Sequence, residues 1–187
     1  QAMRLSTYNK PHVVGCAEDL PHHIGLPRGC LDDVRKTLAD LGVRTAIRDE
    51  RRDGSRLEVK LQGELRQQQK AAADAMLRHE TGVLAATTAF GKTVVAAWLI
   101  ARRGVDALVL VHRRQLLDQW VERLSTFLDI PTRSIGRIGG GRSRPTGRVD
   151  VGIIQSLVRK GVVSDIVADY GHVIIDMTPN APGGGIT

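Results

Sequence analysis

Four short apolar runs in the second half of the chain alternate with longer stretches of helical periodicity. Each run has the length of a buried strand, and each longer stretch places its apolar residues three or four positions apart, as on one face of a helix. The predicted strands cover residues 82–86, 106–111, 148–155 and 172–176, and the predicted helices cover residues 65–80, 93–104 and 114–128. Strands that alternate with helices predict a parallel sheet with crossover helices, which is an α/β fold.

The first third of the chain follows a different pattern. Helical spacing and apolar–polar alternation predict a helix over residues 31–42 and strands over residues 13–17, 43–50 and 56–61. The Asp53-Gly54 pair between the last two runs suits a tight hairpin turn. We therefore expect a small α+β module over residues 1–62. Residues 177–187 break the pattern and are expected to form a flexible tail.

Composition sets broad limits on the class of protein. With 42% hydrophobic residues the chain can bury a real core, whereas no apolar run approaches the ~18 residues of a membrane span. The first residues lack the charged start and continuous apolar stretch of a secretory signal. We therefore expect a cytoplasmic protein with no membrane partner.

The charge balance favours a polyanionic partner. Lys and Arg number 27 against 20 Asp and Glu, a net charge of +7, although many unrelated soluble proteins are equally basic. Two Phe, two Trp and two Tyr supply few rings for stacking bases. His22, His23 and Cys30 are close in sequence but lack the spacing of a tetrahedral metal site, and Cys16 and Cys30 do not make a disulfide framework.

Residues 86–93, ATTAFGKT, contain most of a phosphate-binding loop. The pattern G-x-x-x-x-G-K-[ST] works because glycine-rich backbone turns its N–H groups toward phosphates at a helix N-terminus. Gly91, Lys92 and Thr93 supply its second half, and Ala86 stands where the first glycine would be. A strand is predicted before the loop and a helix after it, as the motif requires. The alternative is an ordinary strand-to-helix turn with a solvated lysine.

Five segments in order resemble one family. LRQQQ (65–69), ATTAFGKT, VLVHRRQLLDQW, IIQSL and VIID are similar to motifs of the N-terminal RecA-like half of superfamily-two helicases, closest to the type III restriction subunit and excision-repair translocase branch. The resemblance covers about residues 64–176. It implies an incomplete P-loop RecA-like parallel sheet with flanking helices over residues 63–176, preceded by the module at 1–62 and followed by the tail at 177–187.

The resemblance also implies cofactors and their ligands, namely ATP and Mg²⁺. Gln69 would recognise the adenine, and Thr93 and Asp176 would hold the magnesium. The motif that binds the phosphates would comprise Ala86, Thr87, Thr88, Ala89, Phe90, Gly91, Lys92 and Thr93.

Nucleic acid is the expected partner, with DNA favoured and RNA left open. The resemblance implies backbone contacts by Arg113, Arg114, Gln155 and Ser156. Residues 131–149, PTRSIGRIGGGRSRPTGRV, add arginines but no acid, and guanidinium groups suit phosphate recognition. We expect Arg142 and Arg144 of this segment to contact the nucleic-acid backbone; the alternative is a solvated basic loop.

Met177 stands where this family has the glutamate of an Asp-Glu pair. A thioether cannot accept a proton, so the chain is expected to bind ATP without hydrolysing it alone. We therefore expect an N-terminal fragment of an ATP-dependent DNA helicase or translocase, whose partners would include the C-terminal helicase half or a nuclease. One alternative is a non-catalytic nucleic-acid-binding protein with a vestigial nucleotide site. Another is a different P-loop class, such as a kinase or a transport ATPase.

Overall fold

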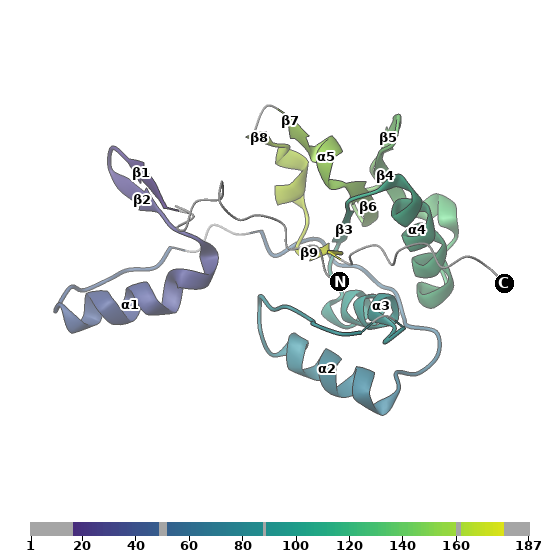
Figure 1. The fold of residues 1–187 in the computed structure, drawn as a ribbon, viewed down its shortest axis with the longest axis horizontal. Coiled ribbons are helices and arrows are strands. Elements are labelled where there is room, and N and C mark those ends of the chain that lie inside the picture. Colours follow the sequence, from purple (N-terminus) through teal and green to yellow (C-terminus); the bar gives the residue numbers. More distant parts are fainter. Residues whose placement is uncertain (1–16, 49–51, 88, 160–161, 178–187) are drawn as a thin grey trace, which may run out of the picture. The chain divides into compact units, whose positions relative to one another are not determined.

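The computed structural model describes residues 17–48, 52–87, 89–159 and 162–177 (Figure 1). Contacts divide the chain into two compact units, Gln1–Asp49 and Glu50–Thr187. Most of the strand predicted over 13–17 and all of the tail after Met177 lie outside the described residues.

The first unit has little buried surface. Strands β1 (Glu18–Leu20) and β2 (His23–Gly25) form an antiparallel pair, followed by η1 (Arg28–Cys30) and helix α1 (Leu31–Asp40). The predicted helix is therefore confirmed, but α1 buries none of its residues.

The predicted hairpin after α1 is wrong. Residues 43–48 have no regular structure, and the segment from Ser55 to Gln62 packs instead within the second unit, to which it belongs. The Leu57 N–H donates to the carbonyl of Gly104 at 2.8 Å, and the Gln62 N–H donates to that of Phe127 at 2.7 Å. Leu57 is 4% exposed and belongs to the core of the second unit. Alternation predicts that one face is buried but not which partner buries it.

That packing bears on the predicted division of the chain. The contacts separate the two units between residues 49 and 50, whereas the sequence pattern predicts one module over residues 1–62. The domain assignment stays a prediction, because contacts alone do not define what folds independently.

The second unit is built on a five-stranded sheet with the order β5-β4-β6-β3-β9 (Figure 1). The α/β class is therefore confirmed. Strands β4, β6, β3 and β9 are parallel neighbours, and β5 pairs antiparallel with β4. The strands cover Ala107–Val111 (β3), Gly136–Gly139 (β4), Arg142–Arg144 (β5), Val149–Ile153 (β6) and His172–Ile175 (β9).

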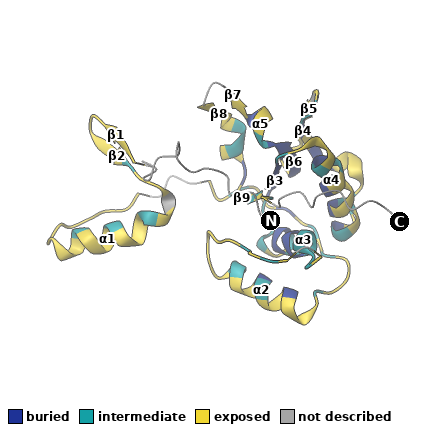
Figure 2. Cartoon of the chain, viewed as in Figure 1, coloured by how far each residue is buried: buried dark blue, intermediate teal, exposed yellow. Residues whose placement is uncertain are grey.

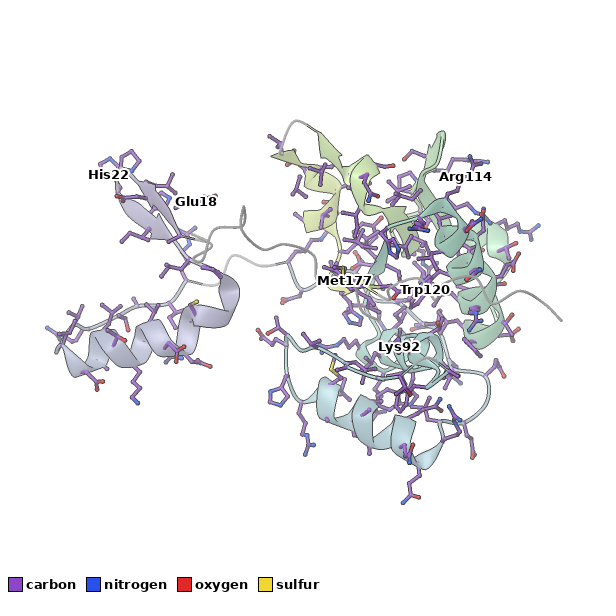
Figure 3. All side chains as sticks on the ribbon, viewed as in Figure 1. Glu18, His22, Lys92, Arg114, Trp120 and Met177 are labelled. Carbon is purple, nitrogen blue, oxygen red and sulfur yellow. The ribbon has the colours of Figure 1, made fainter. Side chains whose placement is uncertain are left out.

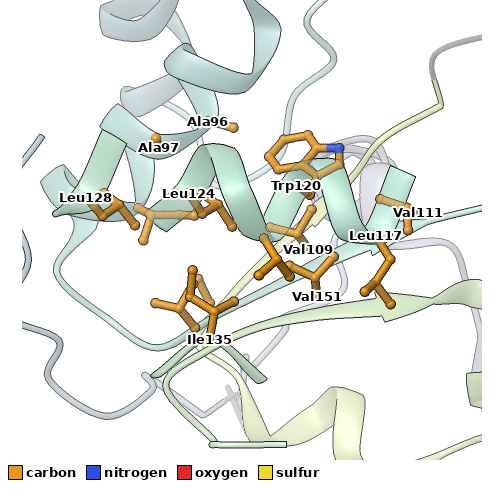
Figure 4. Close-up of a cluster of buried hydrophobic side chains, with 14 of the residues drawn as sticks. Ala96, Ala97, Val109, Val111, Leu117, Trp120, Leu124, Leu128, Ile135 and Val151 are labelled. Atoms are coloured by element: carbon orange, nitrogen blue, oxygen red, sulfur yellow. The ribbon is translucent and has the colours of Figure 1, made fainter. Parts of the chain in front are cut away.

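Three helices, α2 (Gln67–Leu77), α3 (Lys92–Arg103) and α4 (Arg114–Leu128), confirm the three helix predictions. Helices α3 and α4 cover one face of the sheet, and buried side chains from both helices join the main core (Figures 2 and 4). Strand β3 is buried throughout, because Val109 faces that core while Leu108 and Leu110 face a smaller one on the other side. Burial on both faces explains why this strand reads as a continuous apolar run.

The remaining elements lie after the turn at Pro131. They are η2 (Thr132–Ser134), α5 (Ile154–Leu157), the antiparallel pair β7 (Val158–Arg159) and β8 (Val162–Val163), and η3 (Asp165–Asp169). Ile166 and Val167 of η3 pack against the smaller core. None of the helices in the described ranges is long and apolar enough to cross a membrane.

Two sequence predictions in this unit are wrong, one of a strand and one of a loop. Residues 82–87 form no strand, and Val83 is 92% exposed. An apolar run becomes a strand only beside a hydrogen-bonding neighbour, and no described strand pairs with this one. Conversely, the glycine- and arginine-rich segment predicted as a loop contains β4 and β5, because β4 pairs with β6.

Candidate nucleotide site and nucleic-acid interface

The predicted site residues follow the carboxyl ends of three parallel strands. Arg113 and Arg114 come after β3, Gln155 and Ser156 after β6, and Asp176 after β9. Parallel strands place these ends at one edge of the sheet, where open α/β sheets bind ligands. The order β6-β3-β9 sets the predicted nucleic-acid residues beside the aspartate.

The phosphate-loop sequence leads into α3. Gly91 is the N-cap of the helix with a φ of 89°, and Ala89 has a φ of 67°, a left-handed backbone that is uncommon outside glycine. The Lys92 ammonium group donates hydrogen bonds to the carbonyl oxygens of Ala86 at 3.0 Å and Thr87 at 3.2 Å. The lysine therefore bridges the loop through backbone oxygens. Thr88 lies outside the described residues.

Helix α2 holds the same loop from the other side. The Gln69 Nε2 atom and the Arg66 guanidinium both donate to the Phe90 carbonyl at 2.7 Å. The Gln69 Oε1 atom accepts the Arg66 backbone N–H at 2.9 Å. Gln69 is only 4% exposed, so the structure brings it to the phosphate loop; its role toward adenine stays a prediction.

The orientation of α3 brings Lys92 and Thr93 toward Asp176. Arg103, at the C-terminal end of α3, acts electrostatically on His172, the first residue of β9. Burial, with a smaller contribution from the charge of Arg103, lowers the pKa of His172 to about 4. Helix α3 contacts β9 and is about 18 Å long from its 12 residues. Its N-terminal end therefore lies toward the end of β9 at which Asp176 follows.

The contacts of Asp176 include a backbone hydrogen bond and a side-chain hydrogen bond. Its backbone N–H donates to the Leu110 carbonyl at 2.8 Å, extending the pairing of β9 with β3. Its Oδ2 atom accepts the Trp120 indole N–H at 2.8 Å. Met177, the residue that follows Asp176 in the chain, is 75% exposed. Figure 3 labels Met177 together with Lys92 and Trp120. Sequence reasoning placed Trp120 only in the apolar stripe of α4; the missed signal was that a buried indole N–H needs an acceptor.

The oxygen atoms of Thr93 and Asp176 are of the type that binds magnesium. Mg²⁺ prefers oxygen ligands and is usually bound by one or two carboxylates together with substrate phosphates and water. Thr93 offers a hydroxyl in the first turn of α3, and Asp176 offers a carboxylate directly after β9. The described ranges contain no group of three or more His, Cys, Asp or Glu that could hold a metal. A magnesium ion held here would therefore depend on nucleotide phosphates. We call Ala86–Thr93 with Asp176 the nucleotide side.

Three predicted nucleic-acid elements meet at the turn between β4 and β5. The turn glycines Gly139, Gly140 and Gly141 have φ values of 106°, 69° and 90°. A Cβ at Gly139 would meet the Ser156 Cβ at 2.8 Å, and one at Gly140 would meet the Arg114 Cδ at 3.4 Å. The backbone of the turn thus touches the residues that open α4 and α5. Arg113, Arg114 and the β4–β5 hairpin with Gln155 and Ser156 form what we call the nucleic-acid side.

The arginines of this side differ in their surroundings. Arg142 and Arg144 lie in β5, and Arg144 is exposed, as are Arg113, Arg114, Gln155 and Ser156. Arg137 of β4 instead forms an ion pair with Asp118 of α4. This pair ties the hairpin to the helix that carries Arg114.

A buried carboxylate fixes the base of the hairpin. Asp150 of β6 is fully buried and accepts the backbone N–H groups of Gly136 at 3.0 Å, Thr146 at 2.9 Å and Gly147 at 3.0 Å. The Tyr170 hydroxyl also donates to Asp150. Burial, together with this hydrogen bond, raises the pKa of Tyr170. Asp150 could not be identified from the sequence, where it is only an acid inside an apolar strand.

The fold and the loop define a class, the P-loop RecA-like α/β proteins. Residues 62–176 match the family described as "Type III restriction enzyme, res subunit", and the chain belongs to this family. The resemblance inferred from residues 64–176 is thereby confirmed. Family membership implies the use of ATP and Mg²⁺.

Curated relatives are similar over part of their length. The chain is 36% identical over 84 residues to "DNA 3'-5' translocase XPB2" of Sulfurisphaera tokodaii, covering 45% of this chain and 18% of that protein. It is 34% identical over 113 residues to "Putative DNA 3'-5' helicase Rad25" of Halobacterium salinarum, covering 59% and 18%. The chain thus spans less than a fifth of the length of these relatives.

Solved structures share the fold. The crystal structure of T4 UvsW superimposes with a TM-score of 0.54 at 18% identity, over 79% of this chain and 40% of that one. A second crystal structure, of the UvsW helicase from bacteriophage T4, gives a TM-score of 0.50 at 18% identity, over 81% of this chain and 79% of that one. The identities are low, so these similarities concern the architecture of the chain.

Proposed function

We propose that this chain is the part of an ATP-dependent DNA helicase or translocase that binds Mg·ATP and the nucleic-acid backbone, and that it does not hydrolyse ATP alone. The observation that carries the proposal is the shared edge of the sheet. On the nucleotide side, Asp176 follows β9 and the phosphate loop leads into α3. On the nucleic-acid side, the predicted contact residues follow β3 and β6, and β3 is the neighbour of β9 in the sheet. A motor needs both ligands within reach of one rigid scaffold.

The chemistry of the nucleotide side supports the first half of the proposal. Lys92 and Thr93 open a helix of 12 residues, and phosphates bind favourably at such an N-terminus because of its unpaired N–H groups and dipole. Lys92 would exchange its backbone acceptors for phosphate oxygens. Thr93 and Asp176 would supply oxygen ligands to magnesium, which draws charge from the phosphates.

Met177 is the reason to propose binding without turnover. The residue after Asp176 is where the family's motif supplies a glutamate that orients or deprotonates water. A thioether has neither charge nor basic oxygen, and loss of a general base costs about 10²–10⁴ in rate. Met177 is exposed, so a glutamate at this position would meet no steric obstacle from a packed core.

The nucleic acid is proposed to be DNA. The printed names of the first two relatives describe a DNA 3'-5' translocase and a putative DNA 3'-5' helicase, and the exposed arginines of the nucleic-acid side suit phosphate contacts. RNA is the alternative polyanion. The C-terminal helicase half or a nuclease is the proposed protein partner, and the cytoplasm is the proposed location.

Equilibrium binding of a fluorescent ATP analogue to the full chain tests the proposal. Lys92→Ala should reduce the affinity at least about tenfold, because it removes the charge that faces the phosphates. The matched control is Lys70→Ala, which removes a lysine paired with Asp74 on the surface of α2. Equal affinities for the wild type and Lys92→Ala would contradict the phosphate-loop assignment.

One observation favours the second candidate, a non-catalytic nucleic-acid-binding protein. Lys92 is bonded to carbonyls of its own loop, and residues 82–87 form no strand, which is what a vestigial nucleotide site would look like. A salt titration of DNA binding separates the two functions. DNA affinity that falls steeply with salt and ignores nucleotide would favour this candidate, whereas DNA affinity that changes with Mg·ATP would favour the motor.

A further inference from the structure

Trp120 joins the core of the unit to the nucleotide side. It lies on α4, is 5% exposed and belongs to the main core together with Ala96 of α3 and Val109 of β3 (Figure 4). Its indole nitrogen donates a hydrogen bond of 2.8 Å to Oδ2 of Asp176. The side chain therefore packs with one helix and one strand while its single polar atom reaches the predicted magnesium ligand.

The geometry restricts the carboxylate. An indole has one donor and no acceptor, and a ring packed on both sides has few rotamers available. The direction of the N–H is thus set by the core and not by solvent. The backbone of Asp176 is fixed by its bond to Leu110, so the Trp120 hydrogen bond acts on the rotation of the carboxyl group itself. A carboxylate has about four acceptor positions, and the Trp120 N–H takes one of them.

We propose that Trp120 is a positioning residue for magnesium, which holds the Asp176 carboxylate in the orientation that meets the nucleotide-bound ion. The inference rests on the proposed function, because the ion would arrive with ATP. Groups that orient metal ligands commonly change metal affinity by about 10–100-fold when they are removed. A role in packing alone would change stability and leave the magnesium dependence unaltered.

The test is the magnesium dependence of nucleotide binding by the full chain. Trp120→Phe keeps an aromatic ring in the core and removes the N–H. It should raise the Mg²⁺ concentration at half-maximal binding of a non-hydrolysable fluorescent ATP analogue about tenfold. Nucleotide binding without magnesium should stay within about twofold of the wild type. Trp98→Phe is the matched control, because Trp98 lies on α3, packs in another cluster and lies under Lys70 at 5.2 Å.

The outcomes separate this inference from the proposed function. If the wild type binds no nucleotide, the proposed function fails and the inference fails with it. If the wild type binds Mg·ATP and folded Trp120→Phe shows the same magnesium midpoint, the inference alone is overturned. Should Trp120→Phe fail to fold, the indole N–H resonance of the wild type decides. It should shift when Mg²⁺ is added to the nucleotide complex, and a shift no larger than that of Trp98 would overturn the inference.

Discussion

The two sides of the sheet edge are held in different ways. On the nucleic-acid side, β4 is paired with β6, and the buried Asp150 accepts hydrogen bonds from both ends of the hairpin. On the nucleotide side, the loop is held by side chains, with Gln69 and Arg66 bonded to Phe90 and Lys92 bonded to the loop itself. Under the proposed function, the phosphate-binding surface would exist before its ligand binds, whereas the nucleotide loop would have to exchange hydrogen bonds when ATP arrives.

The difference predicts where a single substitution does most damage. Asp150→Ala should destabilise the chain by about 3–5 kcal/mol, because it leaves several buried donors without their acceptor. It should also weaken DNA binding, because the hairpin loses its anchor, and it should change the affinity for nucleotide less than the affinity for DNA. Urea denaturation followed by circular dichroism measures the first effect. Asp165→Ala in η3 is the matched control, since Asp165 is exposed. A loss below about 1 kcal/mol for Asp150→Ala would show that the carboxylate does not anchor the hairpin.

A weaker effect is expected from pH at the start of β9, the end of the strand away from Asp176. The folded-state pKa of His172 is about 4, against 6.5 for an ordinary histidine, so the unfolded chain binds the proton more readily between these values. Stability should therefore be highest above pH 6.5 and fall as the pH drops toward 4, by up to about 1.4 kcal/mol per unit. His172→Leu should flatten the stability profile between pH 5 and 7, and His23→Leu, an exposed control in the first unit, should leave the slope unchanged. Equal slopes for His172→Leu and the wild type would contradict burial of the neutral ring.

The smallest effect is expected within the nucleic-acid side, where an exposed ion pair ties the hairpin to α4. Asp118 and Arg137 are 50% and 45% exposed, so Asp118→Ala should cost less than about 1 kcal/mol of stability. The same change releases Arg137 for phosphate and should steepen the salt dependence of DNA binding by about one counterion. Glu122→Ala, an acid in α4 that is also exposed, controls for net charge. A salt slope equal to that of Glu122→Ala would exclude Arg137 from the interface.

The two sides also differ in how much of their fold the sequence predicts. Strand β3 and helix α4 could be predicted because their patterns reflect local burial: a strand apolar on both faces and a helix with one apolar stripe. Residues 82–86 have an equally clear pattern and form no strand, since pairing depends on a neighbour that composition does not reveal. Strand β4 was missed for the opposite reason, because glycine and arginine conceal a segment whose pairing is provided by β6.

The candidate site shows the same division. Lys92 and Arg114 were predicted as contacts from motifs, because such predictions depend on residue type and spacing, and their roles stay predictions. Trp120 and Asp150 were not identified from the sequence, because Trp120 acts through a partner 56 residues away and Asp150 through backbone groups that only the folded hairpin brings to it. Such contacts are consequences of the folded core. Within the motif-bearing region, sequence therefore predicts candidate ligand contacts better than it predicts the residues that orient them.

Phosphate release by the full chain tests the central claim most directly, which is that a working nucleotide loop occurs here without turnover. The wild type, Lys92→Ala and Met177→Glu would be compared with Mg·ATP, each with and without DNA. We predict that the wild type binds ATP yet releases phosphate no faster than Lys92→Ala in either condition, and that Met177→Glu exceeds both because it restores a carboxylate. Release by the wild type that DNA stimulates and Lys92→Ala abolishes would contradict the account.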